Sequence, residues 1–340
     1  MKVQETNYIK KIPMGNKANN LAILEDIGVN VPSFRMYNIT QDYVEVFTER
    51  FGMFVRAFLN PYYEGKYAVR SSGSVSTPGR MKTVLNVDFN DLVEAGVKVF
   101  NSSQSDRLEN YLKLKGVTDF SAAIVVQQMV DPTLTEHSCS GVLTTCHPIT
   151  GKNGEYGEVV FGKMGEDLMS GKKDPLTLQD LEKRNPTGYA NLLTEIEKIR
   201  VHFPNHQEVE FVIEDTTAWI VQTRDYKNVT PLAADFEGYE LVGFGRPATP
   251  LSVVGFVTTD IERINDFSIY LTDTTDWEDT EQILKGRGVI TKTGGSLSHA
   301  AIIAREFELP CITSVKMKDE QQLSEGMKIG INSMGQIFKM

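Results

Sequence analysis

The stretch "EVEFVIEDTTAWIVQTRDY", which begins at Glu208, constrains the fold more than any other part of the chain. Apolar and acidic residues alternate over its first half, which is the pattern of a half-buried β-strand. The residues "DTT" then separate this strand from a second one, "AWIVQTR". A loop of three residues, from Asp215 to Thr217, places Glu214 opposite Ala218. The stretch therefore predicts an antiparallel hairpin with an acidic face.

The register of this hairpin predicts which polar side chains face one another. Counting back from the turn, Glu210 lies opposite Gln222 and Glu208 lies opposite Arg224. Directly opposed side chains on one sheet face have Cβ atoms about 4.5–5.5 Å apart. Glu210 and Gln222 would then share a hard cation such as Mg²⁺ through oxygen ligands. The alternative is a solvated hairpin face with one Glu208–Arg224 ion pair, and a loop of another length would break the pairing.

A second polar segment is "VRSSGSVSTPGRMKT", in which a short predicted strand, "KYAVRSS", runs into "GSVSTPGRMKT". Its glycine, serine, threonine and proline residues predict a loop. Backbone N–H groups in such a loop are available to phosphate oxygens, and Arg70 adds a guanidinium that binds them through a fork of hydrogen bonds. Lys17, at the start of the helix predicted over residues 17–28, supplies a second cation. The alternatives are an ordinary surface loop and a solvated lysine.

The third candidate site lies in "TKTGGSLSHAAIIAREFELP", residues 291–310. Gly294 and Gly295 permit a tight turn. Ser298 is a candidate N-cap, which places His299 in the first turn of the helix "HAAIIAREF". The N–H groups and the helix dipole at this end stabilise a phosphoryl group, and neutral histidine is a nucleophile near pH 7. The alternative is a capped helix with an incidental histidine.

Length, charge and cysteine content narrow the class of protein. A chain of 340 residues exceeds the roughly 250–300 residues at which one core stops growing, so we expect two domains. The net charge of −10 argues against a general affinity for nucleic acid or anionic membranes. No apolar run reaches the ~20 residues of a membrane helix, and the N-terminus lacks a secretory signal. Three cysteines without CxxC spacing predict no disulfide framework and no zinc site. We expect a reduced, cytoplasmic protein.

Helical and strand patterns are mixed along the chain, which predicts a mixed α+β and α/β fold with partly antiparallel sheets. Residues 228–247 show little periodicity and contain several glycines and prolines, so we expect them to form a linker. The first domain then covers residues 1–227, with two subdomains that divide near residue 120. The second covers residues 248–340.

Six segments in a fixed order resemble the dikinase family, which includes pyruvate phosphate dikinase, phosphoenolpyruvate synthase and rifampin phosphotransferase. They are the Lys17 helix start, the VRSS loop, "VVQQMV", "SGVLTTCHPITGKNGEYGEVVFGKMGED", "EVEFVIE…WIVQTR" and "TGGSLSHAAIIARE". The first domain resembles the ATP-grasp nucleotide-binding domain of this family. The second resembles its small swivelling β/β/α phosphohistidine domain, with "GFGRPATPLSVVG" as the leading motif.

The resemblance implies ATP and Mg²⁺ as cofactors. His299 matches the histidine that attacks the β-phosphate of ATP and expels AMP, after which the phosphorylated domain moves to a second site. Glu210 and Gln222 match the magnesium ligands, and Lys17 and Arg70 match residues that act on the phosphates. The full set that matches nucleotide contacts is Lys17, Arg70, Ser76, Thr77, Gly79, Gln127 or Gln128, Glu166, Glu208, Glu210, Gln222 and Arg224.

Three departures from the family pattern bear on function. Glu208 stands where the family usually has aspartate, and Leu297 replaces the threonine two residues before the histidine of pyruvate phosphate dikinases. The sequence stops at Met340 with no barrel for pyruvate and phosphoenolpyruvate. We therefore expect the phosphoryl acceptor either to bind another polypeptide, as in a split dikinase, or to come directly to His299.

Three hypotheses follow. The first is an autophosphorylating, Mg²⁺-dependent phosphotransferase with an unknown acceptor. The second is a stand-alone small-molecule kinase or ATP-driven ligase, and the third is a nucleotide-binding regulatory module without turnover. A degenerate copy would be expected to lose at least one key residue, and this chain retains all of Lys17, Arg70, Glu210, Gln222, Arg224 and His299.

Overall fold

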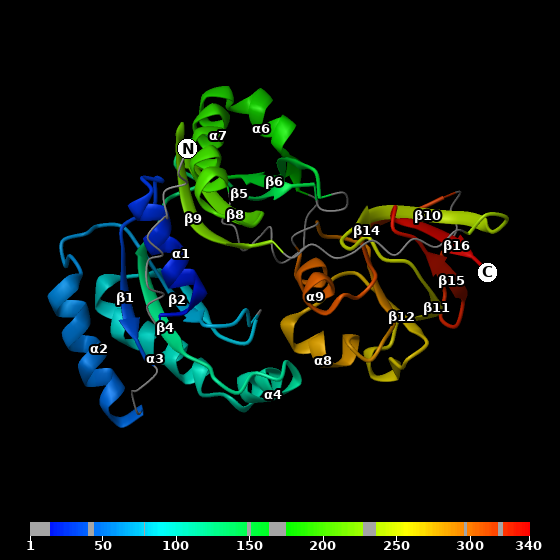
Figure 1. The fold of residues 1–340 in the computed structure, drawn as a ribbon, viewed down its shortest axis with the longest axis horizontal. Helices are drawn as coiled ribbons and strands as arrows, with labels where there is room; N and C mark the ends of the chain where they lie inside the picture. Colours follow the sequence, from blue (N-terminus) through cyan, green and yellow to red (C-terminus); the bar gives the residue numbers. More distant parts are fainter. Residues whose placement is uncertain are drawn as a thin grey trace, which may run out of the picture. The chain divides into compact units, whose positions relative to one another are not determined.

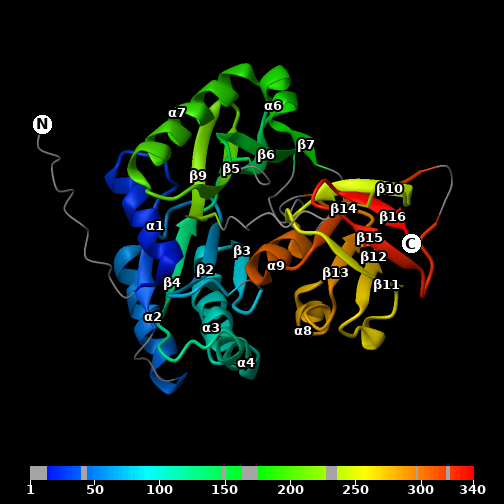
Figure 2. The same ribbon diagram turned by 45° about the vertical axis from the view of Figure 1, so that its right-hand side comes forward.

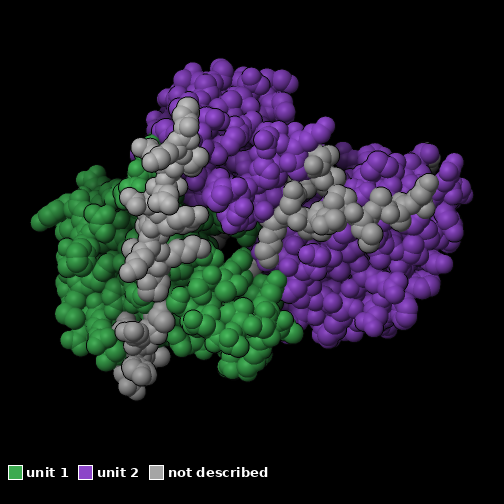
Figure 3. All heavy atoms as spheres, in the orientation of Figure 1, with its two compact units in different colours: residues 1–130, 221–224 green, residues 131–220, 225–340 purple. Residues whose placement is uncertain are grey.

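The residues that the computed structural model describes fall into two units, shown in different colours in Figure 3. Unit 1 comprises Met1–Val130 and Val221–Arg224, and unit 2 comprises Asp131–Ile220 and Asp225–Met340. Of the residues discussed above, Glu166 and Leu297 lie outside the described ranges. These ranges are 14–39, 44–77, 79–147, 151–162, 175–226, 236–295, 298–318 and 322–340.

Unit 1 is an antiparallel sheet covered by helices (Figure 1). Its elements are α1 (Gly15–Asp26), β1 (Phe34–Asn38), α2 (Val44–Phe58), β2 (Tyr67–Gly73), β3 (Thr83–Val87), α3 (Leu92–Ser103), α4 (Asp106–Leu114) and β4 (Ala122–Gln128). The strand order is β1-β4-β2-β3. Phenylalanines from α2 and α3 fill the core on one side, where the rings of Phe47 and Phe100 stack 4.3 Å apart.

The central position of β4 fixes where the first subdomain ends. This strand pairs with β1 on one side and with β2 on the other, from Ala122 to Gln128. Removing it from unit 1 would break two rows of ladder hydrogen bonds. The division that we expected near residue 120 therefore falls after β4, at Val130.

The first part of unit 2 is a sheet with the strand order β7-β6-β5-β8-β9. Its elements are β5 (Cys139–Cys146), β6 (Asn153–Phe161), β7 (Leu176–Thr177), α6 (Leu178–Arg184), α7 (Pro186–His202), β8 (Gln207–Glu214) and β9 (Thr217–Asp225). The predicted hairpin strands are thus present as β8 and β9. Residues Val221–Arg224 of β9 are grouped with unit 1.

The second part of unit 2 is a closed barrel, which Figure 2 shows with its helices. Its elements are β10 (Glu240–Pro247), β11 (Val253–Thr258), β12 (Ser268–Thr272), α8 (Thr280–Ile283), β13 (Gly288–Thr291), α9 (His299–Phe307), β14 (Cys311–Met317), β15 (Lys328–Ile331) and β16 (Gln336–Lys339). Neighbouring strands from β11 to β14 are parallel, so crossover segments that contain α8 and α9 connect them. Isoleucine and valine side chains fill the interior.

The predicted linker is shorter than expected at its C-terminal end. Residues 240–247 form β10, which pairs with both β14 and β16. Two register shifts interrupt these ladders, between Leu241 and Gly243 and between Phe244 and Arg246. The sequence pattern did not indicate β10, because its glycines and proline weaken the alternation of apolar and polar residues that marks a regular strand.

The mixed helix and strand content agrees with the expected fold class. All three cysteines are free and buried. Within the described ranges, no helix has the length and apolar character needed to span a bilayer.

Candidate functional site

The start of α1 is fastened to the end of β2. Gly15 has φ +77°, and a Cβ at this position would overlap the carbonyl of Ser72. The N–H of Ala18 donates to Oγ of Ser72 at 3.0 Å, in a buried position. The side chain of Asn16 donates to the carbonyl of Ser74 at 3.1 Å. These contacts hold Lys17, which is half-buried, at the end of the strand that contains Arg70.

The predicted phosphate loop begins where β2 leaves the sheet. Arg70 lies opposite Thr83 of β3 and Val125 of β4 and is half-buried. Beyond β2, the backbone includes Gly79 at φ +63°, and Ser76 and Thr77 are half-buried. Pro78 lies outside the described residues. The loop closes at Arg80, whose guanidinium packs over the ring of Tyr111, 5.3 Å from its centroid.

Two further predicted residues belong to the same unit as Lys17 and Arg70. The side chain of Asn20 in α1 donates to the carbonyl of Thr223 at 2.8 Å. Thr223 lies between Gln222, which is buried, and Arg224, which is half-buried. This contact ties the last part of β9 to α1, although these segments are 203 positions apart in sequence.

The two glutamines at the end of β4 have different environments. Gln127 is 1% exposed, and its Nε2 has no hydrogen-bond partner among the described residues. Gln128 is half-buried and its side chain hydrogen-bonds to Tyr67. Burial raises the pKa of Tyr67, and the hydrogen bond from Gln128 partly offsets that rise. The sequence left open which of the two glutamines contacts the nucleotide. Gln128 is the more accessible of the two, because Gln127 is almost fully buried.

The hairpin retains a defined register at its open end. The N–H of Tyr226 donates to the carbonyl of His206 at 2.7 Å, and Nε2 of Gln207 donates to Oδ1 of Asp225 at 2.7 Å. At the turn, β9 begins at Thr217, so the connection is one residue shorter than the expected three-residue loop. Asp215 there has φ +56°, a conformation that aspartate adopts more readily than most residues.

Glu208 makes a buried ion pair that the sequence did not indicate. Its Oε2 lies 3.3 Å from Nη2 of Arg305 in α9, and both side chains are 6% exposed. The guanidinium of Arg305 also lies over the ring of Tyr226. Burial raises the pKa of Tyr226, and the charge of Arg305 partly offsets the rise. Glu210 is half-buried and lies opposite Val142 of β5.

A second ion pair links β6 to the barrel. Oε1 of Glu158 accepts from Nη1 of Arg246 in β10 at 2.9 Å. A Cβ at Gly295 would overlap the carboxylate of Glu158, so the glycine turn before α9 packs directly against this side chain. Neither Glu158 nor Arg246 was a predicted site residue, since they are 88 positions apart and no local pattern connects them.

His299 is the first residue of α9 and is 4% exposed. Its Nδ1 lies 2.8 Å from Oγ1 of Thr275, and its ring lies 4.0 Å from that of Trp277 between centroids. Ser298 occupies the N-cap position as predicted, but its hydroxyl makes no capping hydrogen bond. The helix begins instead with a main-chain bond from Ile302 N to the carbonyl of Ser298.

The glycine turn is held from β14. Gly294 has φ +101°, which glycine tolerates without a steric penalty. The hydroxyl of Ser314 donates to the carbonyl of Gly294. Ser314 itself has φ +50°, a strained conformation for a residue other than glycine. In this conformation the Ser314 hydroxyl reaches the turn that precedes His299.

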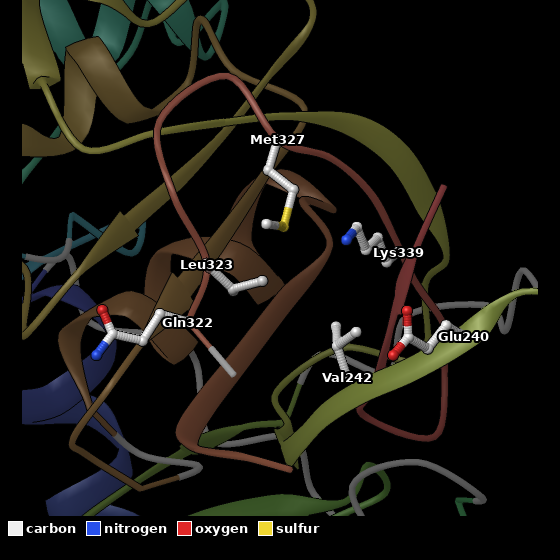
Figure 4. A pocket seen from close by; sticks show the side chains of 6 residues that line it. All are labelled: Glu240, Val242, Gln322, Leu323, Met327 and Lys339. Atoms are coloured by element: carbon white, nitrogen blue, oxygen red, sulfur yellow. The ribbon is translucent and has the colours of Figure 1, made fainter. Parts of the chain in front are cut away.

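A separate cavity of about 220 Å³ lies in the barrel, away from the predicted residues (Figure 4). Glu240, Val242, Gln322, Leu323, Met327 and Lys339 line it. None of the catalytic or nucleotide-binding residues expected from the sequence is among them.

Two family models match the chain. The first, "Pyruvate phosphate dikinase, AMP/ATP-binding domain", matches residues 56–185. The second, "PEP-utilising enzyme, mobile domain", matches residues 264–334 and so includes His299. Their order is the order that the sequence motifs predicted.

Curated relatives carry the same description. Pyruvate, phosphate dikinase from Clostridium symbiosum is 27% identical over 73% of this chain and 35% of its own length. Its counterpart from Rickettsia prowazekii is 27% identical over 71% of this chain and 33% of its own length. The chain therefore spans about a third of the length of the curated relatives it matches.

Solved structures give weaker matches. D-alanyl-alanine synthetase A from Vibrio cholerae is 12% identical, with a TM-score of 0.35 over 64% of this chain and 56% of that chain. C-terminally truncated Cdc123 from Schizosaccharomyces pombe is 12% identical, with a TM-score of 0.36 over 61% of this chain and 82% of that chain. These low scores do not by themselves define a fold.

Proposed function

Because this chain is a member of the dikinase family of phosphoenolpyruvate-utilising enzymes, we propose that it is an ATP-dependent phosphotransferase that works through a phosphohistidine. His299 takes the β-phosphoryl group of ATP with release of AMP and passes it to an acceptor. The observation that carries this proposal is the state of His299 itself, which is buried at a helix N-terminus with its ring held by Thr275 and Trp277.

The nucleotide is proposed to bind to residues that unit 1 gathers around α1 and β2. Lys17 and Arg70 neutralise phosphate charge, and the backbone of the Ser76–Arg80 loop donates to phosphate oxygens. The contacts of α1 with Ser72 and Thr223 support this arrangement, because they tie Lys17 to the segments that carry Arg70 and Arg224. Further proposed contacts are Gln128, Glu166, Glu208, Glu210 and Gln222.

Magnesium is proposed to bind Glu210 and Gln222 together with phosphate oxygens of the nucleotide. The main-chain bond from Tyr226 N to His206 O supports the proposal, because counting inward from this pair sets Glu210 opposite Gln222. Counting from the two-residue connection at Asp215 and Thr216 sets Glu210 opposite Val221, so the proposed pairing requires a one-residue shift within the hairpin. The described residues contain no cluster of three or more His, Cys, Asp or Glu side chains able to hold a metal. One carboxylate and one amide oxygen fit Mg²⁺ bound largely through phosphates and water, where it would neutralise developing charge.

The proposed reaction accounts for each phosphoryl group of ATP. A lone pair on the His299 ring attacks the β-phosphorus, and the bond between that phosphorus and the oxygen bridging to the α-phosphorus breaks. AMP leaves with the electron pair of that bond. The γ-phosphoryl group passes to phosphate or water, and the β-phosphoryl group stays on His299. Burial of the ring limits premature hydrolysis by bulk water.

The acceptor of the phosphoryl group is proposed to be bound by a partner subunit or to be a small molecule that reaches His299. Transfer from ATP straight to a small molecule, as a kinase or a ligase performs it, is the second candidate. Nucleotide binding without turnover is the third. These candidates differ in which label stays on the protein and which nucleotide is released.

The test uses Mg²⁺ and ATP labelled separately at the β and γ positions. We expect the protein to retain the β label in an acid-labile form and to release AMP. His299→Asn should abolish the retained label, whereas the matched variant His137→Asn, at a half-exposed histidine, should not. Bound ATP without any label would favour the regulatory module, and ADP formed only in the presence of an added acceptor would favour the kinase.

A further inference from the structure

We propose that Arg80 is a positioning residue, whose guanidinium packs on Tyr111 of α4 and thereby holds the Ser76–Arg80 loop in place for the phosphates of ATP. This inference rests on the proposed function, because it concerns the nucleotide site described there. The Cζ atom of Arg80 lies 5.3 Å from the centroid of the Tyr111 ring, and the two residues are 5% and 1% exposed. Arginine is rarely buried so fully, so its burial beside a polar loop calls for a structural reason.

The segment that carries this loop is fastened where it leaves β2. Ser74 N donates to the carbonyl of Ser121 at 2.8 Å, and Ser121 N donates to Oγ of Ser74 at 3.1 Å. The side chain of Asn16 donates to the carbonyl of Ser74 at 3.1 Å. Ser121 directly precedes β4, so the beginning of the segment is tied to an inner strand of the sheet.

The other end of the segment is fastened to α3. Lys82, which directly precedes β3, donates its N–H to Oγ of Ser102 at 2.8 Å. The Ser102 hydroxyl in turn donates to the carbonyl of Val99 at 2.6 Å. Both ends are therefore fixed by hydrogen bonds, and the position of the backbone between them depends on the contacts of the loop itself.

Arg80 is the last residue of a tight turn within this loop. Its N–H donates to the carbonyl of Thr77 at 3.1 Å, and Gly79 has φ +63°. A hydrogen bond between the first and fourth residues, with a positive φ at the third, is characteristic of a β-turn. A shift of Arg80 would therefore move the turn as a unit, together with Thr77 and its neighbour Ser76.

Tyr111 gives the guanidinium a fixed surface to pack on. Ser105 caps the start of α4, where its Oγ accepts from Leu108 N at 3.3 Å. Leu108 and Tyr111 are three positions apart and almost fully buried, so this face of the helix is held in the core. The face of an aromatic ring attracts a guanidinium, and the attraction is stronger where both groups are desolvated.

A loop that is held in place before ATP arrives loses less conformational entropy on binding. Loss of the Arg80–Tyr111 contact should therefore weaken the binding of ATP. It should weaken the binding of AMP less, because AMP offers the loop one phosphoryl group and ATP offers three. This difference distinguishes a role in positioning the loop from a general role in stability, which would affect both nucleotides alike.

The test uses the full chain with His299→Asn, so that ATP is not consumed through His299, and titrates it with ATP and AMP in the presence of Mg²⁺ by calorimetry. Arg80→Met and Tyr111→Leu should each weaken ATP binding about tenfold and AMP binding less than about twofold. Tyr111→Phe keeps the aromatic ring and should retain both affinities. Arg56→Met, at an exposed arginine of α2, is the matched control.

The double variant Arg80→Met with Tyr111→Leu should bind ATP no more weakly than either single variant, because both changes remove the same contact. Strictly additive losses, equal weakening of ATP and AMP, or unchanged ATP affinity in Arg80→Met would overturn the role of Arg80. Binding of AMP shows that a variant is folded, and Arg80→Met supplies the test if Tyr111→Leu does not fold.

The outcomes also separate this inference from the proposed function. A chain with wild-type His299 that retains no label, although Arg80→Met selectively reduces ATP affinity, would overturn the phosphotransfer and support the role of Arg80. A chain that binds no ATP at all would overturn the nucleotide site and the role of Arg80 together.

Discussion

Nη2 of Arg305 lies 3.3 Å from Oε2 of Glu208, and the pair is buried in unit 2. The two residues come from α9 and β8, which are 97 positions apart at this contact. The guanidinium of Arg305 lies over the ring of Tyr226, with its Cζ atom 5.6 Å from the ring centroid. The helix that begins at His299 is therefore joined by a buried charge pair to the strand that carries Glu210.

Loss of one member of this pair should destabilise unit 2. Glu208→Gln leaves the buried guanidinium of Arg305 without its counter-charge, which should cost about 3 kcal/mol of unfolding free energy. Urea titration followed by circular dichroism measures the loss. Glu195→Gln, which breaks the more exposed Lys198–Glu195 pair, should cost less than about 1 kcal/mol. Equal losses in the two variants would show that burial does not strengthen the Glu208–Arg305 pair.

Two glycines of similar backbone conformation should respond differently to alanine. Gly15 has φ +77° and lies against the Ser72 carbonyl, whereas Gly28 has φ +74° and open space around it. Gly28→Ala should cost about 1 kcal/mol of stability from backbone strain alone. Gly15→Ala adds a clash with backbone atoms and should cost about 3 kcal/mol and weaken ATP binding through displacement of Lys17. Thermal unfolding and nucleotide titration measure both effects, and similar results for the two variants would contradict the role of α1.

The glycine turn before α9 should be sensitive to added volume. Gly295→Ala pushes against the Glu158 carboxylate, which its ion pair with Arg246 holds in place. We expect a loss of about 1–3 kcal/mol in stability and slower labelling of His299. Glu158→Ala in the same chain removes the clash, so the double variant should recover part of the stability lost in Gly295→Ala. Strictly additive losses in this double-mutant cycle would mean that the two residues do not interact.

Alkaline pH should destabilise unit 2 through its buried thiols. Burial raises the pKa of Cys139 and of Cys311 from 9.0 to about 12. Above pH 9 the unfolded chain loses these protons while the folded chain keeps them, so stability falls as pH rises from about 9 towards 12. Denaturant midpoints across this range measure the slope, which should become shallower in Cys311→Ala. An unchanged slope would indicate that Cys311 does not titrate on unfolding.

Local patterns predicted individual elements well. The alternation in β8, the three-residue turn signal "DTT" and the glycine–helix motif before α9 each lie within one short stretch, where propensity and periodicity act directly. The hairpin connection differed by one residue, at Thr217, because strand boundaries depend on hydrogen bonding rather than on composition. Ser298 was correctly placed at the start of α9, although its side chain does not form the cap.

Contacts between distant segments were not predictable in the same way. Thr275, Arg305 and Glu158 reach their partners only because the folded chain brings separate loops and strands together. The sequence "TDTTDWEDT" does contain a capping-box signal around Asp276. That signal predicts a local turn, but it does not indicate that the neighbouring Thr275 contacts His299, which is 24 positions away. The resemblance to a family identified His299, whereas only the fold identified the residues that hold it.

The pairing of β10 with β16 closes the barrel. Glu240 at the beginning of the domain is the ladder partner of Lys339 near its end, so the first and last strands are neighbours. A domain of this kind is topologically self-contained, because every strand partner it requires lies within its own stretch of chain. Such a stretch can be transplanted, fused or circularly permuted between β16 and β10 without breaking a ladder elsewhere, which makes the barrel a transferable unit rather than an extension of the sheets before it.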